Sequence, residues 1–191
     1  KVADVLIVAT LDNQHYKPSI QAMRLGYDLI LEKPISYQKE ECDEIAKVAK
    51  ETGRSITVCH VLRYAPFYAK IKGLLESGRF GKIFHLSMSE HVGYFHFAHS
   101  YVRGPWRNMQ SSAPIILAKS CHDLDLLAWF VEEKCQKVSS FGDLCHFKSE
   151  NAPLGHTKRC SDCPHKEECV YSAFRIYLSD EYERQAALAR H

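Results

Sequence analysis

The 191-residue chain contains no apolar run that approaches the roughly 18–20 residues of a membrane span. No secretory signal, internal repeat or low-complexity segment is apparent either. The formal net charge is only +2, so the strong positive excess typical of nucleic-acid-binding proteins is missing. These absences argue against membrane and nucleic-acid partners. The usage of cysteine, in turn, predicts a cytoplasmic protein.

The composition is that of a globular protein with a sizeable core, because 46% of the residues are hydrophobic and 25% are charged. Eight cysteines are many for a reducing compartment, but five of them are scattered along the chain. A secreted disulfide scaffold would be shorter and would contain less core-forming sequence. We therefore expect free thiols and a reducing environment.

The first 60 residues alternate between apolar runs and amphipathic segments. The pattern predicts strands over 5–9, 27–31 and 55–59. It also predicts a helix with Pro18 in its first turn that ends after Leu25, and a second helix from an N-cap at Ser36 to Thr52. A continuous apolar run such as 5–9 is typical of a parallel strand buried on both faces. This β-α-β-α-β order indicates an α/β fold with a parallel sheet, half of a doubly wound domain.

The pattern changes after residue 60. We expect helices over 66–75 and 116–130 and strands over 82–89 and 134–144, which together indicate a second, α+β domain. The expected domains are therefore 1–60 and 61–191.

An acid, an amine and a proline, Glu32-Lys33-Pro34, follow the second predicted strand. Open parallel sheets bind ligands at the carboxyl ends of their strands, so Lys33 is a candidate functional cation. His122 is a candidate general base, since imidazole titrates near neutral pH. On a continuous helix Lys119 and Asp125 would lie on nearly the same face as His122. The alternative interpretation of both motifs is an ordinary turn and an amphipathic helix.

Several planar or aromatic side chains accompany these motifs. Such groups suit a polyol or sugar, which has apolar faces and a hydroxyl rim. The candidate substrate residues are Arg63, Tyr64, Trp106, Arg107 and Asp123. The alternative is a partly exposed loop.

Cys160, Cys163 and Cys169 have a spacing that suits a structural zinc ion, with His165, His156 or Cys145 as the fourth ligand. The alternatives are free thiols, or one disulfide and one thiol, in a connecting loop.

The order of these motifs resembles the glucose–fructose oxidoreductase / inositol dehydrogenase (Gfo/Idh/MocA) family. The resemblance rests on Thr10-x2-Asn13-x-His15, Glu32-Lys33-Pro34, Arg63-Tyr64-x-Pro66, Gly78-x2-Gly81-Lys82-Ile83 and His122-Asp123-x-Asp125. It implies a Rossmann domain that binds NAD or NADP, and a second domain with an open, largely antiparallel sheet that binds substrate and mediates homo-oligomerisation.

The resemblance also implies residue roles. Lys33 would hydrogen-bond the reacting hydroxyl, His122 would exchange its proton, and Thr10, Asn13, His15, Glu32, Lys33 and Pro34 would line the cofactor. The reaction would be hydride transfer between nicotinamide and a carbinol of a sugar or polyol. Alternatives are epimerisation or glycoside cleavage through transient oxidation, and a non-catalytic regulator that binds cofactor or sugar.

Two features depart from the family pattern. No G-x-G-x-x-G occurs in the chain, so we expect a fragment that lacks the N-terminal part of the Rossmann domain, is truncated at its C-terminus and is inactive alone. Many members carry an aspartate four residues before the histidine, where this chain has Ala118 followed by Lys119. We expect Lys119 to stand in as a cation that lowers the proton affinity of His122 and stabilises an alkoxide.

Overall fold

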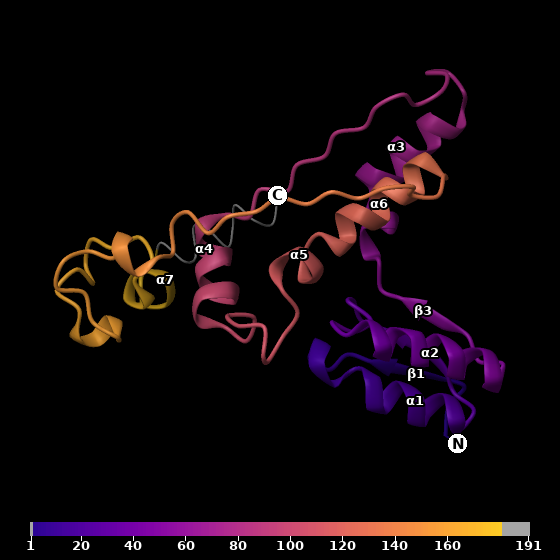
Figure 1. Ribbon diagram of the computed structural model, residues 1–191, viewed down its shortest axis with the longest axis horizontal. Coiled ribbons are helices and arrows are strands. Elements are labelled where there is room, and N and C mark those ends of the chain that lie inside the picture. The colour runs from indigo at the N-terminus through magenta and orange to yellow at the C-terminus, as the bar shows by residue number, and fades with distance from the viewer. Residues whose placement is uncertain (1, 181–191) are drawn as a thin grey trace. The chain divides into compact units, whose positions relative to one another are not determined.

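The computed structural model describes residues 2–180 (Figure 1). Two compact units divide them. Residues 2–91 and 100–135 form the first unit, and residues 92–99 and 136–180 form the second.

The first unit begins with a three-stranded parallel sheet. Its strands are β1 (Val5–Val8), β2 (Asp28–Leu31) and β3 (Ile56–Val58), in the order β1-β2-β3. The helices between them are α1 (Tyr16–Arg24) and α2 (Lys39–Thr52). This is the α/β, Rossmann-like arrangement that the sequence predicts.

The core lies between one face of this sheet and the two helices. Leu29 and Leu31 of β2 are 2% and 0% exposed, and they pack with Met23 of α1 and Val48 of α2. Because consecutive parallel strands are joined by right-handed crossovers, both helices cover the same face. Ile7 of β1 points to the other face and is 65% exposed, so the expectation of a strand buried on both sides is wrong for β1.

The start of α2 also differs from the prediction. The helix begins at Lys39, and Ser36 is not its N-cap. The Ser36 hydroxyl instead accepts a hydrogen bond from the Gln38 backbone N–H and donates one to Glu41, which forms a turn before the helix. Gly53 ends the helix as predicted, with a left-handed φ of 65°.

Three further helices complete the first unit: α3 (Pro66–Glu76), α5 (Ile115–Ala118) and α6 (Cys121–Val131). The single helix expected over 116–130 is therefore interrupted at Lys119 and Ser120. Lys119 and Asp125 therefore do not share one continuous helix, so helical spacing alone does not place Lys119 on the face of His122.

The segments expected as strands, 82–89 and 134–144, form no strand among residues 2–180. Alternating side chains define a strand only when a neighbouring backbone completes the hydrogen bonds. Phe84 is 94% exposed and Phe141 is 96% exposed, so neither side chain packs in a core. The expected antiparallel sheet is not formed within these residues.

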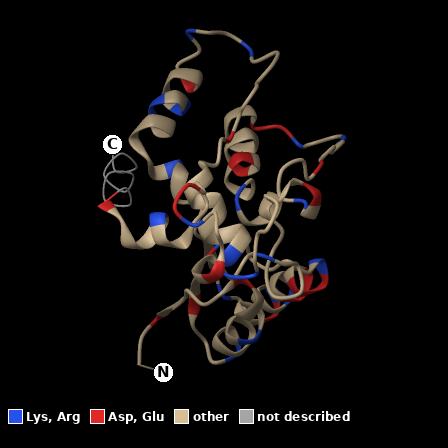
Figure 2. Cartoon of the chain, turned by 90° about the vertical axis from the view of Figure 1, so that its left-hand side faces the viewer, with Lys and Arg blue, Asp and Glu red and all other residues tan. Residues whose placement is uncertain are grey.

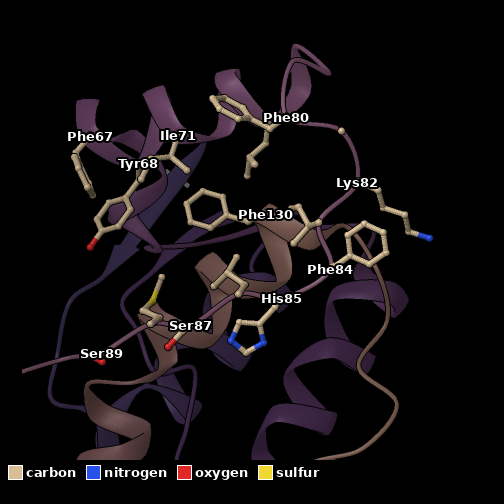
Figure 3. Close-up of a pocket in the computed structure, with 15 residues that line it drawn as sticks. Phe67, Tyr68, Ile71, Phe80, Lys82, Phe84, His85, Ser87, Ser89 and Phe130 are labelled. Atoms are coloured by element: carbon tan, nitrogen blue, oxygen red, sulfur yellow. The ribbon is translucent and has the colours of Figure 1, made fainter.

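An apolar pocket of about 690 Å³ lies between α3, the segment 80–89 and α6. Figure 3 shows Phe130 of α6 projecting between Ile71 of α3 and Phe84 of the extended segment.

The second unit contains α4 (Tyr94–Phe97) and α7 (Ala173–Leu178). Its centre is aromatic: Phe97 stacks on Phe147 with ring centroids 5.3 Å apart, and Tyr171 packs edge-on against Phe147 at 5.1 Å.

Charges of both signs share the same elements (Figure 2). On α2, for example, Lys39 pairs with Asp43, and Lys47 lies 3.7 Å from Glu44. Among residues 2–180, none of the helices combines the length and the apolar character needed to cross a membrane.

Candidate active site

Lys33 follows the carboxyl end of β2 and reaches a distant part of the chain. Its ammonium donates a hydrogen bond to the backbone carbonyl of Ala118, at 2.6 Å across 85 positions of sequence. Glu32 accepts a hydrogen bond from the Lys33 backbone N–H at 3.3 Å, and the Lys33–Pro34 peptide is cis. At the position where the family often has an aspartate, this chain therefore presents a backbone carbonyl to the lysine.

His15 connects the loops that follow β1 and β2. Its ring is 1% exposed, with Nδ1 2.9 Å from the Pro34 carbonyl and Nε2 3.0 Å from the Thr10 carbonyl. Two predicted cofactor segments, around Thr10 and around Pro34, are thus fixed to each other by one buried side chain. This geometry makes His15 a support for the loops.

Thr10 and Asn13 line a pocket of about 420 Å³ beside the first turn of α1. The pocket lies at the carboxyl end of β1, where doubly wound folds bind their nucleotides. Its walls offer hydroxyl, amide and ammonium groups that suit a ribose. The lining residues are Thr10, Asn13, Gln14, Tyr16, Lys17, Pro18 and Glu41.

Asp12, which the sequence interpretation missed, links the same loop to residues a hundred positions later. Its carboxylate is buried and accepts hydrogen bonds from the Trp106 indole at 3.2 Å and from the Ala113 backbone N–H at 2.8 Å. An acidic residue in a turn is common, so the sequence did not indicate that Asp12 accepts hydrogen bonds from distant residues. The contact places Trp106 beside the β1 loop.

His122 lies in the first turn of α6, close to several charged groups. Burial lowers the pKa of His122 below its ordinary value of 6.5, and the positive charge of Lys33 lowers it further. His60 and Lys119 act in the same direction, whereas Asp123 opposes them. A neutral imidazole is the form that can accept a proton.

Lys33 also affects the neighbouring thiol. Burial raises the pKa of Cys121, and the ammonium of Lys33 partly offsets that rise. Lys33, Cys121 and His122 therefore share one local environment although 88 positions separate the first two.

Arg63 is engaged by an acidic residue of α6. Its guanidinium donates two hydrogen bonds to Asp125, from Nε at 2.7 Å and from Nη2 at 2.6 Å. This partner raises the pKa of Arg63. A bidentate pair of this kind fixes both side chains in orientation.

The other predicted substrate residues differ in exposure. Tyr64 is 82% exposed, and Arg107 is exposed with its guanidinium donating to the Arg103 carbonyl at 3.2 Å. Trp106 and Asp123 are half-buried. Contact with substrate stays a prediction for all four.

The three clustered cysteines do not form the expected metal site. Among residues 2–180, no group of three or more His, Cys, Asp or Glu side chains is arranged to hold a metal ion. Cys160 Sγ instead accepts a contact from the Ala173 backbone N–H at 3.5 Å, and His165 Nε2 lies 2.8 Å from the Leu154 carbonyl. The spacing allowed a zinc site, but Cys160 and His165 have other partners, and Cys160, Cys163 and Cys169 form no disulfide with one another.

Two family models match the chain. Residues 1–60 match an oxidoreductase family with an NAD-binding Rossmann fold, and residues 68–156 match the C-terminal domain of the same GFO/IDH/MocA family. The chain belongs to the Gfo/Idh/MocA oxidoreductase family. The resemblance drawn from the motifs is confirmed.

Two relatives are similar over most of the chain. YteT of Bacillus subtilis (strain 168), an oxidoreductase by name, is 28% identical over 172 residues, which are 88% of this chain and 40% of YteT. The scyllo-inositol 2-dehydrogenase (NAD(+)) of the same strain is 27% identical over 139 residues, 73% of this chain and 38% of the enzyme. The chain thus spans about two-fifths of the length of these relatives.

A solved structure shares the fold. The WlbA dehydrogenase from Bordetella pertussis, crystallised with NADH and UDP-GlcNAcA, is 25% identical with a TM-score of 0.55. The match covers 68% of this chain and 37% of that protein.

Proposed function

We propose that the protein containing this chain is an oxidoreductase that transfers a hydride between nicotinamide and a carbinol carbon of a sugar or polyol. The observation that carries the proposal is the hydrogen bond from Lys33 to the last residue of α5, just before α6 begins. The Lys33 ammonium bonds to the Ala118 carbonyl, and its charge acts on His122 four residues later. The positive charge of a hydrogen-bond donor therefore acts on a candidate base whose pKa is lowered, which supports assigning both residues to one site.

Each residue has a defined part in the proposed oxidation. Lys33 donates a hydrogen bond to the reacting hydroxyl and stabilises the negative charge that develops on its oxygen. His122 accepts the hydroxyl proton as the carbon–hydrogen bond breaks and the carbonyl forms. Bound nicotinamide supplies the acceptor for the hydride. The reverse sequence reduces the carbonyl.

The residues at the carboxyl ends of β1 and β2 fit the nicotinamide ribose half of such a cofactor. Thr10 and Asn13 face a pocket, and His15 fixes their loop to the Glu32-Lys33-Pro34 loop. The matching family description and the two relatives that bind or use NAD support NAD as the dinucleotide. Parallel titrations of the full-length protein with NADH and NADPH would decide between the two.

Replacing Lys33 tests the proposal. Lys33→Met keeps the length of the side chain but removes the donor, so kcat/KM for polyol oxidation in the full-length protein should fall about 100- to 1000-fold. The assay follows nicotinamide absorbance across a panel of inositols, sugars and sugar acids. Lys50→Met, on the exposed face of α2, is the matched control and should leave the rate unchanged.

The same assay separates the other schemes. Substrate conversion without net NADH would favour transient oxidation, as in an epimerase or a glycoside-cleaving enzyme. Cofactor binding without conversion of any substrate would favour a regulator. Turnover by Lys33→Met within about threefold of the unmodified protein would remove Lys33 from the chemistry.

A further inference from the structure

His60 occupies a position between the sheet and α6 that no predicted motif includes. It follows β3 directly, and its backbone N–H donates to the Val58 carbonyl at 2.8 Å. Its side chain is 26% exposed. The ring packs almost perpendicular to that of His122, at 83°, with centroids 5.9 Å apart. His60 thus contacts the candidate base from the sheet side.

On its other side His60 approaches the Arg63–Asp125 pair. His60 Nδ1 lies 3.9 Å from Asp125 Oδ2, and that oxygen also accepts the 2.7 Å bond from Arg63 Nε. His60 and Arg63 are three positions apart on one segment, as His122 and Asp125 are on α6. The pair His60 and Arg63 therefore contacts the pair His122 and Asp125. The Asp125 side chain is only 12% exposed.

The two imidazoles have unsatisfied nitrogens. His60 Nδ1 and His122 Nδ1 are both buried, and neither has a hydrogen-bond partner within residues 2–180. A buried polar nitrogen without a partner costs free energy, so such atoms are retained mainly where they act. The 3.9 Å separation from Asp125 exceeds a hydrogen bond by less than an ångström. A small displacement of His60 would bring Nδ1 within hydrogen-bond distance of Asp125 Oδ2.

We propose that His60 is a positioning residue for the proposed oxidation: it orients the imidazole of His122 and couples it to the Arg63–Asp125 pair. The proposal rests on the proposed function, because it assigns His60 a task at the same site. Asp125, held by Arg63, would fix the His60 ring once a small displacement brings Nδ1 within hydrogen-bond distance of Oδ2, and the His60 ring in turn restricts rotation of His122. His60 itself does not touch the reacting atoms.

The charged groups around His122 set the expected pH effect. Lys33 approaches from the β2 loop, Lys119 from the helix break and Asp123 from α6 itself, and His60 adds to the groups that lower the pKa of His122. Oxidation requires neutral His122, so the rate declines as pH falls through that pKa. Removing His60 should raise the pKa of His122 and move the acidic limb of the kcat/KM profile to higher pH.

Two substitutions separate positioning from packing. His60→Asn retains a polar group near the place of Nδ1 but cannot become charged, whereas His60→Phe fills the space without a polar group. We expect His60→Phe to lower kcat/KM about tenfold or more, a part of the 10²- to 10⁴-fold effect of general base catalysis. His60→Asn should recover most of the rate, and both variants should show the shifted limb. His85→Asn, on the exposed segment beside α3, is the matched control.

An independent readout is the titration of the His122 ring followed by ¹⁵N NMR in the full-length protein, with and without His60→Asn. An upward shift of the His122 midpoint supports the proposal. An unchanged midpoint together with equal rate losses for His60→Asn and His60→Phe would overturn it in favour of packing. If the unmodified protein converts no polyol, the proposed function fails, and the NMR midpoint still tests the coupling of His60 to His122.

Discussion

Asp12 offers the sharpest test of how the first unit is held together. Its carboxylate is 5% exposed and one oxygen, Oδ2, accepts both the Trp106 indole N–H and the Ala113 backbone N–H. The other oxygen accepts the Asn13 backbone N–H at 3.0 Å. One side chain therefore satisfies donors from the β1 loop and from the segment that leads into α5.

The cost of removing it can be worked from these bonds. Asp12→Ala leaves the Trp106 and Ala113 donors without a partner, and each unsatisfied buried donor costs about 1–3 kcal/mol. The free energy of unfolding should therefore fall by about 2–6 kcal/mol, a large share of the roughly 5–15 kcal/mol of a typical domain. Asp12→Asn keeps one acceptor oxygen but loses the charge, so a smaller loss of about 1–2 kcal/mol is expected.

The assay is urea unfolding of the full-length protein followed by far-ultraviolet circular dichroism. Trp106→Phe, which removes one donor and leaves the Ala113 bond, should cost about 1 kcal/mol. Asp43→Ala is the matched control, since Asp43 forms an exposed ion pair on α2, and exposed pairs contribute little to stability. If Asp12→Ala unfolds at the same urea concentration as Asp43→Ala, the Asp12 bonds do not hold these segments together.

Two further substitutions test contacts that join distant segments. Lys72 is 5% exposed; it donates a hydrogen bond to the Trp129 carbonyl at 2.9 Å and pairs with Glu132. Lys72→Met should therefore lower the free energy of unfolding by about 1–3 kcal/mol. A urea midpoint for Lys72→Met equal to that of Glu132→Gln would contradict this. His15→Leu removes the support between the two cofactor loops and should weaken NADH binding, measured by fluorescence titration, as well as stability. Unchanged affinity for NADH would show that the loops keep their places without His15.

Local sequence determined the first half of the fold. Apolar runs, Pro18 in the first turn of α1 and Gly53 after α2 act through the backbone conformations of neighbouring residues, so a pattern of a few positions suffices. The same kind of reasoning misplaced the start of α2, because the Ser36 hydroxyl accepts a hydrogen bond from the Gln38 backbone N–H in a turn before the helix. Capping depends on which of several nearby donors a side chain reaches.

Patterns that need a distant partner were less informative. The alternation over 82–89 is a property of the segment, but a strand also requires a neighbouring backbone, and the described residues provide none. The spacing of Cys160, Cys163 and Cys169 permits a metal site, yet a tetrahedral site also needs a loop that turns all the thiols towards one point.

The sequence by itself identified Lys33 and His122 as members of one motif set, through the order and the spacing of the motifs. Only the tertiary structure showed that the Lys33 ammonium reaches the Ala118 carbonyl, that Asp12 holds Trp106, and that His60 lies between His122 and Asp125. These contacts join residues 62 to 94 positions apart. They depend on how a sheet loop docks against a helix, and the packing of the whole unit decides that.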